Sequence, residues 1–223
     1  MRPAPMLTPR TEILPPPQRA LWPELTGVPG GFVLYGGTAL ALRLGHRASE
    51  DFDLFSNEDF RPDDLERRIP FLRDPRRLQS SPSTLVVQVD RGGPVKVAFF
   101  GGLSLRRIQD PEPVEENRLL VASLLDLAAT KVKVVQDRAE AKDYIDIGRI
   151  LEEGMDLAQA LGAARAVYGE GFNPLLSLKA LTYFDDGDLR RLPESLRSKL
   201  TQAVQRVDTE HLPKMGSFSG VAP

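Results

Sequence analysis

Residues 31–55 read GFVLYGGTALALRLGHRASEDFDLF, and this stretch decides the fold. The apolar run 32–35 contains β-branched and aromatic residues and is followed by Gly36 and Gly37, which predicts a short strand that ends in a tight turn. Residues 38–44 are good helix formers. A glycine turn that leads into a helix exposes backbone N–H groups at the positive end of the helix dipole. The stretch therefore predicts a place where a phosphate group can bind.

Two acidic residues follow this helix at a spacing that places them together. Asp51 and Asp53 are two apart in a run whose other members are Phe52, Leu54 and Phe55. In a strand, residues i and i+2 face the same side, so both carboxylates project from one face. Carboxylate oxygens with substrate phosphates are the usual ligands of Mg²⁺. Each motif alone is usually structural, either an ordinary turn or a solvated strand edge, but their order and spacing together favour a site for metal-bridged phosphates.

These motifs resemble a known family. Its signature is matched by Gly36-Gly37-Thr38, by the Leu-Gly-His-Arg run at 44–47, and by Ser49, Asp51, Asp53 and Phe55 at alternate positions. The stretch is similar to that of the AbiEii/AbiGii toxin-type nucleotidyltransferases, in the DNA polymerase β-like superfamily, which include toxins that act on tRNA ends. The resemblance covers about residues 30–150. It implies an α+β fold, with a polymerase β-like mixed sheet and helices followed by a C-terminal helical bundle.

The same resemblance implies an activity and a set of partners. The activity would be Mg²⁺-dependent transfer of a nucleoside monophosphate from an NTP to an acceptor hydroxyl, with a tRNA 3′ end as the suggested acceptor. The protein would then be the toxin of a toxin–antitoxin system, with an antitoxin as a protein partner.

A second part of the family signature lies near the middle of the chain. Lys131, Arg138 and the run Lys-Asp-Tyr-Ile-Asp at 142–146 match it. By this likeness Lys131 would contact nucleotide phosphates, and Asp146 would help to shape the active site with Asp143 as its neighbour. The alternative is structural: Lys131 extends its ammonium to solvent, while the two acids pair with Lys142, Arg138 or Arg149 on the surface.

The expected site can now be stated residue by residue. The expected catalytic residues are Asp51, Asp53, Lys131 and Asp146, and the metal ligands among them are Asp51 and Asp53. The expected nucleotide-binding residues are Gly36, Gly37, Thr38, Arg47, Ser49, Lys131 and Asp143. Arg47 and Ser49 enter this set because they lie in the turn that leads into the acidic strand.

One departure from the family pattern concerns a third acid. Polymerase β-like folds often supply a third carboxylate from the strand that corresponds here to residues 95–100, but this run is VKVAFF. Alternation places Lys96 and Ala98 on one face, and Ala98 stands where the acid is expected. With two carboxylates, the metal that activates the attacking hydroxyl is less secure. The alternative function is therefore a nucleotide-binding regulatory module without turnover.

Composition narrows the chemistry further. The chain has 223 residues, 41% of them hydrophobic, and a formal net charge of −2, so any contact with nucleic acid must come from a local patch. With no cysteine and two histidines, disulfides, thiolate catalysis and a Cys/His zinc site are excluded. There is no signal-peptide core and no apolar run near the ~18–20 residues that span a bilayer, so we expect a cytoplasmic protein.

The rest of the chain predicts two domains, at 1–110 and 111–223. The first begins with a loose proline-rich arm of about ten residues, which includes Pro3 and Pro5, and a helix at 18–25 anchored by Trp22. It continues with a helix at 62–69 and a hairpin of strands 84–90 and 95–100. A polar linker at 106–117 then leads to helices at 121–136, 140–153, 157–168, 174–184 and 193–212, and to a fraying tail at 216–223.

An arginine cluster lies in and after the helix expected at 62–69. It consists of Arg67, Arg68, Arg73, Arg76 and Arg77. A solvated helix face is the simpler interpretation, and a patch that follows the phosphates of an RNA is the alternative. A third hypothesis, a structural RNA-binding protein, depends on this patch.

Overall fold

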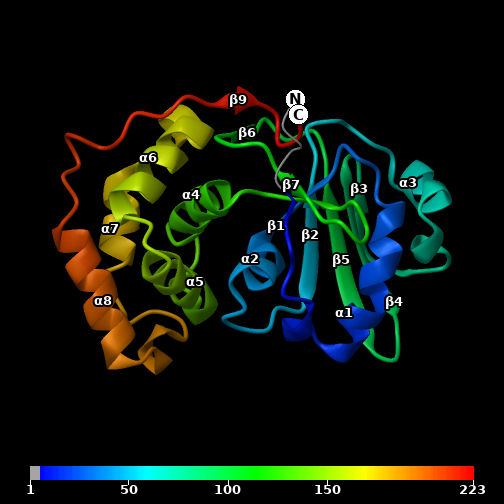
Figure 1. The fold of residues 1–223 in the computed structure, drawn as a ribbon, viewed down its shortest axis with the longest axis horizontal. Helices are drawn as coiled ribbons and strands as arrows, with labels where there is room; N and C mark the ends of the chain where they lie inside the picture. Colours follow the sequence, from blue (N-terminus) through cyan, green and yellow to red (C-terminus); the bar gives the residue numbers. More distant parts are fainter. Residues whose placement is uncertain (1–5) are drawn as a thin grey trace. The chain divides into compact units, whose positions relative to one another are not determined.

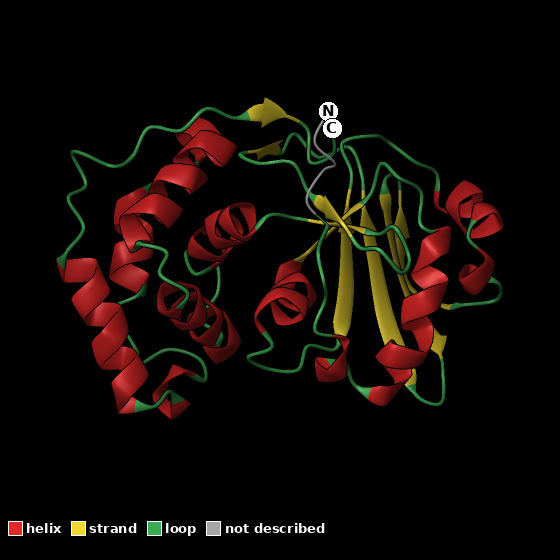
Figure 2. Cartoon of the chain, in the orientation of Figure 1, coloured by secondary structure: helices red, strands yellow, loops and turns green. Residues whose placement is uncertain are grey.

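The computed structural model describes residues 6–223 (Figure 1). Pro3 and Pro5 of the expected arm lie outside the described residues. The chain divides into two compact units. The first comprises the described residues up to Ser123 together with Ser219–Pro223, and the second comprises Leu124–Phe218. Figure 2 shows that strands dominate the first unit and helices the second.

The first unit is built on a seven-stranded mixed sheet with the order β3-β4-β5-β2-β1-β8-β7. β1 pairs antiparallel with β2 and parallel with β8, while β2 pairs parallel with β5. This is the mixed α+β architecture that the sequence predicts. The strands are β1 Val33–Tyr35, β2 Asp51–Phe55, β3 Arg76–Ser81, β4 Thr84–Asp90, β5 Pro94–Phe100, β7 Glu112–Pro113 and β8 Leu120–Val121; the short segments β6 and β9 are Arg106–Arg107 and Phe218–Ser219.

Three helices cover this sheet. Figure 1 shows α2 on one face and α1 and α3 on the other. Their bounds are α1 Pro16–Leu21, α2 Gly36–Leu44 and α3 Pro62–Arg68. α2 begins two residues earlier than the helix predicted at 38–44, so Gly36 and Gly37 form its first turn, while its end at Leu44 is as predicted. Gly45 follows with φ 61° and donates its N–H to the carbonyl of Ala41 at 2.8 Å, a conformation that glycine takes at little cost.

Trp22 anchors the lead-in segment, as predicted. It is buried, it stacks on Phe52 with ring centroids 6.3 Å apart, and its Nε1 donates to Glu116 Oε2 at 2.9 Å. The expected helix at 18–25 is wrong in its limits. α1 ends at Leu21, and a 3₁₀ segment, Trp22–Gly27, follows, since Pro23 has no N–H to continue the α-helical ladder.

The described part of the N-terminal arm is attached to the first unit. The N–H of Leu7 donates to the carbonyl of Pro113 at 3.1 Å, and the N–H of Arg10 donates to the carbonyl of Leu42 at 2.8 Å. The expectation of a loose arm is therefore wrong from Leu7 to Arg10.

The first unit extends beyond the expected boundary at residue 110. The polar segment 106–117 is not a solvated linker, because it contributes β7 and a buried Asn117. Asn117 donates from Nδ2 to the carbonyl of Trp22 at 2.9 Å and accepts from the N–H of Leu119 at 3.1 Å. These hydrogen bonds satisfy polar groups that would otherwise oppose burial.

The chain also returns to the first unit at its end. Arg107, which is buried, donates from Nη1 to the carbonyls of Ser219 and Ala222, both at 2.9 Å. The predicted fraying tail is therefore wrong for residues 219–222.

The second unit contains five α-helices among the described residues. They are α4 Leu124–Val134, α5 Ala141–Glu152, α6 Leu157–Tyr168, α7 Pro174–Ala180 and α8 Glu194–Gln205. α4 begins later than expected because Leu120–Val121 form β8, and α7 and α8 end earlier than expected. Asp156 and Gln159 form a capping box at the start of α6. None of the described helices has the length and apolarity required to cross a membrane.

Candidate active site

The first turn of α2 is crowded by functional side chains. Gly36 has φ 74°, and a Cβ added there would collide with a carboxylate oxygen of Asp53. A Cβ added at Gly37 would lie 2.7 Å from Arg47 Nη2 and 2.9 Å from Ser49 Oγ. Gly36 therefore requires glycine because of its positive φ, whereas at Gly37 the Arg47 and Ser49 side chains would have to shift to admit a side chain. The start of α2 thus lies beside an acid, a guanidinium and a hydroxyl. This brings together five of the predicted site residues.

Thr38 fixes the helix to the acidic strand. Its side chain is buried, and its hydroxyl donates to the carbonyl of Asp51. Because this hydroxyl already has an acceptor, the group that Thr38 can offer to a phosphate is its backbone N–H.

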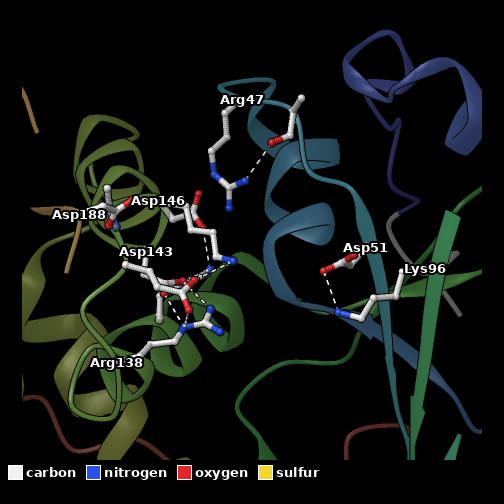
Figure 3. A network of polar contacts seen from close by, with 12 residues as sticks. Arg47, Asp51, Lys96, Arg138, Asp143, Asp146 and Asp188 are labelled. Atoms are coloured by element: carbon white, nitrogen blue, oxygen red, sulfur yellow. Dashed lines mark hydrogen bonds and ion pairs between the residues drawn. The ribbon is translucent and has the colours of Figure 1, made fainter. Parts of the chain in front are cut away.

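Asp51 and Asp53 lie on the same face of β2, as the alternation predicts, while Phe52 and Leu54 are buried. Asp51 is directly opposite Lys96 on β5, and the Lys96 Nζ lies 3.1 Å from Asp51 Oδ2 (Figure 3). Both side chains are partly exposed, so the ion pair competes with water and is weak. A dissociable cation thus neutralises one of the two expected metal ligands.

Ala98 lies directly opposite Asp53 in the same pair of strands and is buried. The strand therefore places a methyl group beside the acid pair at the position of the expected third carboxylate. Among the described residues no cluster of three or more metal-binding side chains is found.

The two aspartates nevertheless fit a Mg²⁺ ion. They are hard oxygen donors on one strand face, and the lack of a side chain at Gly36 allows the Asp53 carboxylate to lie against the start of α2. Mg²⁺ is commonly held by one or two carboxylates, with substrate phosphates and waters completing its shell. The donor set suits one ion that arrives with its nucleotide.

A second cluster lies within the helical unit. Lys131 on α4 is 4% exposed, and its Nζ lies 2.7 Å from Asp143 Oδ1 and 2.6 Å from Asp146 Oδ2 on α5 (Figure 3). Both carboxylates are fully buried. The two acids reach the same lysine because residues three apart share a helix face.

Arg138 completes this cluster. Its Nε donates to Asp143 Oδ2 at 2.8 Å, and its Nη2 donates to Asp143 Oδ1 at 3.2 Å. Burial opposes ionisation of Asp143, but the Arg138 hydrogen bond and the charge of Lys131 outweigh it, so the pKa of Asp143 lies below its usual value. Asp143 is therefore a buried carboxylate held charged by two cations.

The structural alternative drawn from the sequence is right that Arg138 pairs with Asp143, but wrong in where it places Lys131 and the two acids. Lys131 does not extend to solvent, and the acids are not on the surface. Lys142 pairs with Glu140 at 2.8 Å, and Arg149 pairs with Glu152 at 3.3 Å. The ammonium of Lys131 instead joins α4 to α5.

One residue near these clusters, Lys96, has no role predicted from the sequence. Lys96 faces the acid pair, and the alternation that placed it on the face of Ala98 was the available signal. Arg138, by contrast, is one of the partners that the sequence offered for the two acids, and it bonds to Asp143.

The arginine cluster is in part neutralised by acids of α3. Arg77 pairs with Asp63 at 2.7 Å and also with Glu66, and Arg67 pairs with Asp64. These pairs favour the solvated-face interpretation over an RNA-binding patch.

A glycine turn against an acidic strand, in a mixed sheet followed by helices, is the arrangement of a nucleotidyltransferase, and comparison with known proteins agrees. The family model described as "Nucleotidyl transferase AbiEii toxin, Type IV TA system" matches residues 25–218. This chain belongs to that family and is a nucleotidyltransferase.

Individual relatives show the same likeness. The chain is 30% identical over 163 residues to "Uncharacterized protein aq_aa25" of Aquifex aeolicus (strain VF5). The aligned region covers 72% of this chain and 77% of that protein. MenT4, a nucleotidyltransferase toxin from Mycobacterium tuberculosis H37Rv, shares the fold with a TM-score of 0.57 and 14% identity, over 86% of this chain and 83% of that one. The match to the "Crystal structure of putative nucleotidyltransferase from H. pylori" has a TM-score of 0.53 and 20% sequence identity. It covers 84% of this chain and 90% of that one.

Proposed function

We propose that this chain transfers a nucleoside monophosphate from a Mg²⁺-bound NTP to an acceptor hydroxyl. The observation that carries this proposal is the approach of Gly36 to the Asp53 carboxylate, which brings the start of α2 and the acid pair together. When bound, Mg²⁺ would neutralise and orient phosphate oxygens, and Asp51 and Asp53 would hold it.

The residues of the first unit divide the work of binding. The N–H groups at the start of α2, from Gly36 to Thr38, suit phosphate oxygens because they have no partner within the helix. Arg47 and Ser49, beside Gly37, add a positive charge and a hydroxyl donor.

The reaction follows from this arrangement. The acceptor oxygen attacks the α-phosphorus, the bond from that phosphorus to the pyrophosphate oxygen breaks, and pyrophosphate leaves with the electron pair. The proton of the acceptor hydroxyl passes to solvent. Positioning and charge neutralisation supply most of the rate enhancement.

In the helical unit, we propose that Lys131, Asp143 and Asp146 contribute as one charged group. Because the Lys131 ammonium lies between two buried carboxylates, it would act by holding Asp146 and its neighbour Asp143 in the positions that shape the site. The burial of all three side chains supports a shared role, because none of them can be moved without exposing the charge of another.

The acceptor and the setting are extended from the family. We propose a tRNA 3′ end as the acceptor, an antitoxin as the partner, and the cytoplasm as the location. The type IV toxin–antitoxin description of the family supports the toxin role.

Pyrophosphate release, measured with each NTP and a tRNA pool, tests the proposal. We expect release with at least one NTP that is abolished by Asp53→Asn and retained by Asp64→Asn, a carboxyl of α3 that pairs with Arg67 on the surface. Equal release from both variants would remove the acid pair from the mechanism.

One observation favours a second candidate, a nucleotide-binding module without turnover. Ala98 occupies the strand position opposite Asp53 where a third acid is expected. NTP binding that persists while no acceptor gives pyrophosphate would support this candidate against the transferase.

A further inference from the structure

The helical unit contains a cavity of about 330 Å³ that includes none of the predicted site residues. Its walls come from the loop after α4, from α5 and α7, and from the turn before α8. The residues that matter here are Arg138, Tyr144, Leu176, Lys179, Tyr183 and Asp186. A volume at the lower end of the range for small-molecule sites suits a single nucleotide.

The apolar part of the cavity has a fixed floor and an exposed rim. Tyr144 is buried, and its hydroxyl donates to the carbonyl of Ala180 at 3.2 Å. Burial, with the negative charges of Asp143 and Asp186, raises the pKa of Tyr144 to about 12, so the phenol keeps its proton. At the rim, Leu176 is 51% exposed and Tyr183 is 50% exposed. An exposed aromatic ring beside an exposed leucine is a surface on which a base can stack.

The polar part of the cavity carries both signs of charge. Lys179, in the last turn of α7, and Asp186 are exposed, and neither has an ion-pair partner among residues 6–223. A lysine suits a phosphate, while a carboxylate accepts from ribose hydroxyls or from the amino group of a base. This combination matches a ribonucleotide better than it matches a phosphate alone, which Asp186 would repel.

Arg138 connects the cavity to the buried cluster. The same guanidinium lines the cavity and donates two hydrogen bonds to Asp143, which pairs with Lys131. A phosphate at this wall would therefore contact the partly exposed cation that pairs with Asp143, the buried acid that also binds Lys131.

We propose that this cavity binds one nucleotide of an RNA strand, with its base on Tyr183 and Leu176, its phosphate at Lys179 and Arg138, and its ribose near Asp186. The proposal rests on the proposed function in taking RNA as the acceptor. It assigns to the helical unit a recognition site for that strand, separate from the glycine turn and the acid pair.

Binding of a fluorescein-labelled single-stranded ribonucleotide, ACCA, to the full chain without divalent metal tests the proposal. We expect Tyr183→Ala to weaken binding at least about fivefold, because stacking on an aromatic contributes a large share of the affinity for each base. Lys179→Gln should weaken binding and lower its salt dependence by about one unit of slope. Phe218→Ala and Lys142→Gln, at an exposed aromatic and an exposed cation outside the cavity, are the controls.

Amide chemical shifts complete the test. We expect ACCA to change the amide chemical shifts of residues 176–186. If AMP bound with an affinity similar to that of ACCA, the cavity would take a free mononucleotide rather than a strand. The inference would be overturned if Tyr183→Ala bound ACCA as tightly as the unmodified chain, or if the chemical-shift changes were confined to the arginine cluster. A protein partner would then be the occupant of this rim.

The experiment separates this inference from the proposed function. Because it uses no metal and no turnover, it can be repeated on Asp53→Asn, which should bind ACCA as the unmodified chain does. Binding without pyrophosphate release under any condition contradicts the transferase alone, and release that is insensitive to Tyr183→Ala contradicts the nucleotide cavity alone.

Discussion

Replacing Lys131 by methionine should destabilise the helical unit far more than an ordinary lysine replacement. The substitution keeps most of the aliphatic chain but removes an ammonium that lies 2.7 and 2.6 Å from two fully buried carboxylates. Removing one partner of a buried ion pair costs about 3–5 kcal/mol, because it leaves an uncompensated charge. We expect a loss of that size in the free energy of unfolding at pH 7, measured by urea unfolding with circular dichroism.

The matched control is Lys133→Met on the same helix. Lys133 pairs with Asp137 at 2.9 Å, but the two side chains are 23% and 65% exposed. An exposed pair of this spacing contributes about 0.3–0.5 kcal/mol. The two variants should therefore differ by at least about 2 kcal/mol.

The difference should also depend on pH. A carboxyl whose pKa is lowered by folding contributes stability above its unfolded pKa and loses it as the pH falls through the folded value. Asp143 is such a group, partly because of Lys131. In Lys131→Met its pKa rises, so protonation relieves the buried charge at a higher pH. The gap between the variant and the unmodified chain should thus narrow as the pH falls from 7 towards 4. Equal losses for the two lysine variants, or a gap independent of pH, would refute this account of the cluster.

Three further predictions concern the first unit. Gly36→Ala should abolish pyrophosphate release because its Cβ would press on the Asp53 carboxylate, whereas Gly92→Ala, with φ 75° and no atom within 4 Å, should lose only about 1–2 kcal/mol in thermal unfolding and keep its activity. Lys96→Met should raise Mn²⁺ affinity up to about fivefold by calorimetry, since a competing cation is removed, and an unchanged affinity would contradict that competition. Arg107→Met should lower the free energy of unfolding by about 1.5–3 kcal/mol and speed amide hydrogen exchange at residues 219–222. Unchanged exchange would show that other contacts hold the tail.

The sequence predicts the local chemistry of the first unit well. A strand, a glycine turn, a helix and an alternating acidic strand follow from propensity and period alone, and Asp51 and Asp53 share a face for that reason. The pairing of Asp53 with Ala98 could be anticipated because the family pattern supplied the neighbouring strand. These features depend on neighbours in sequence or on one known strand pair.

Features that depend on distant contacts could not be predicted. β3 consists wholly of exposed residues, so it has no hydrophobic alternation to reveal it. β8 is only two residues long, and its parallel pairing with β1 stops the expected helix from starting at residue 121. The burial of Lys131 has the same origin, because a lysine beside an apolar stripe is compatible with solvent or with a buried pair until α5 is placed.

The hydrogen bonds between Arg107 and residues 219–222 have a consequence for folding during translation. A ribosome makes the strands of the first unit early, but the carbonyls of Ser219 and Ala222 emerge only after the whole helical unit. Until then the buried guanidinium of Arg107 lacks these acceptors. In a nascent chain, therefore, β6 pairs with β9 and Arg107 reaches these carbonyls only after the helical unit has been made.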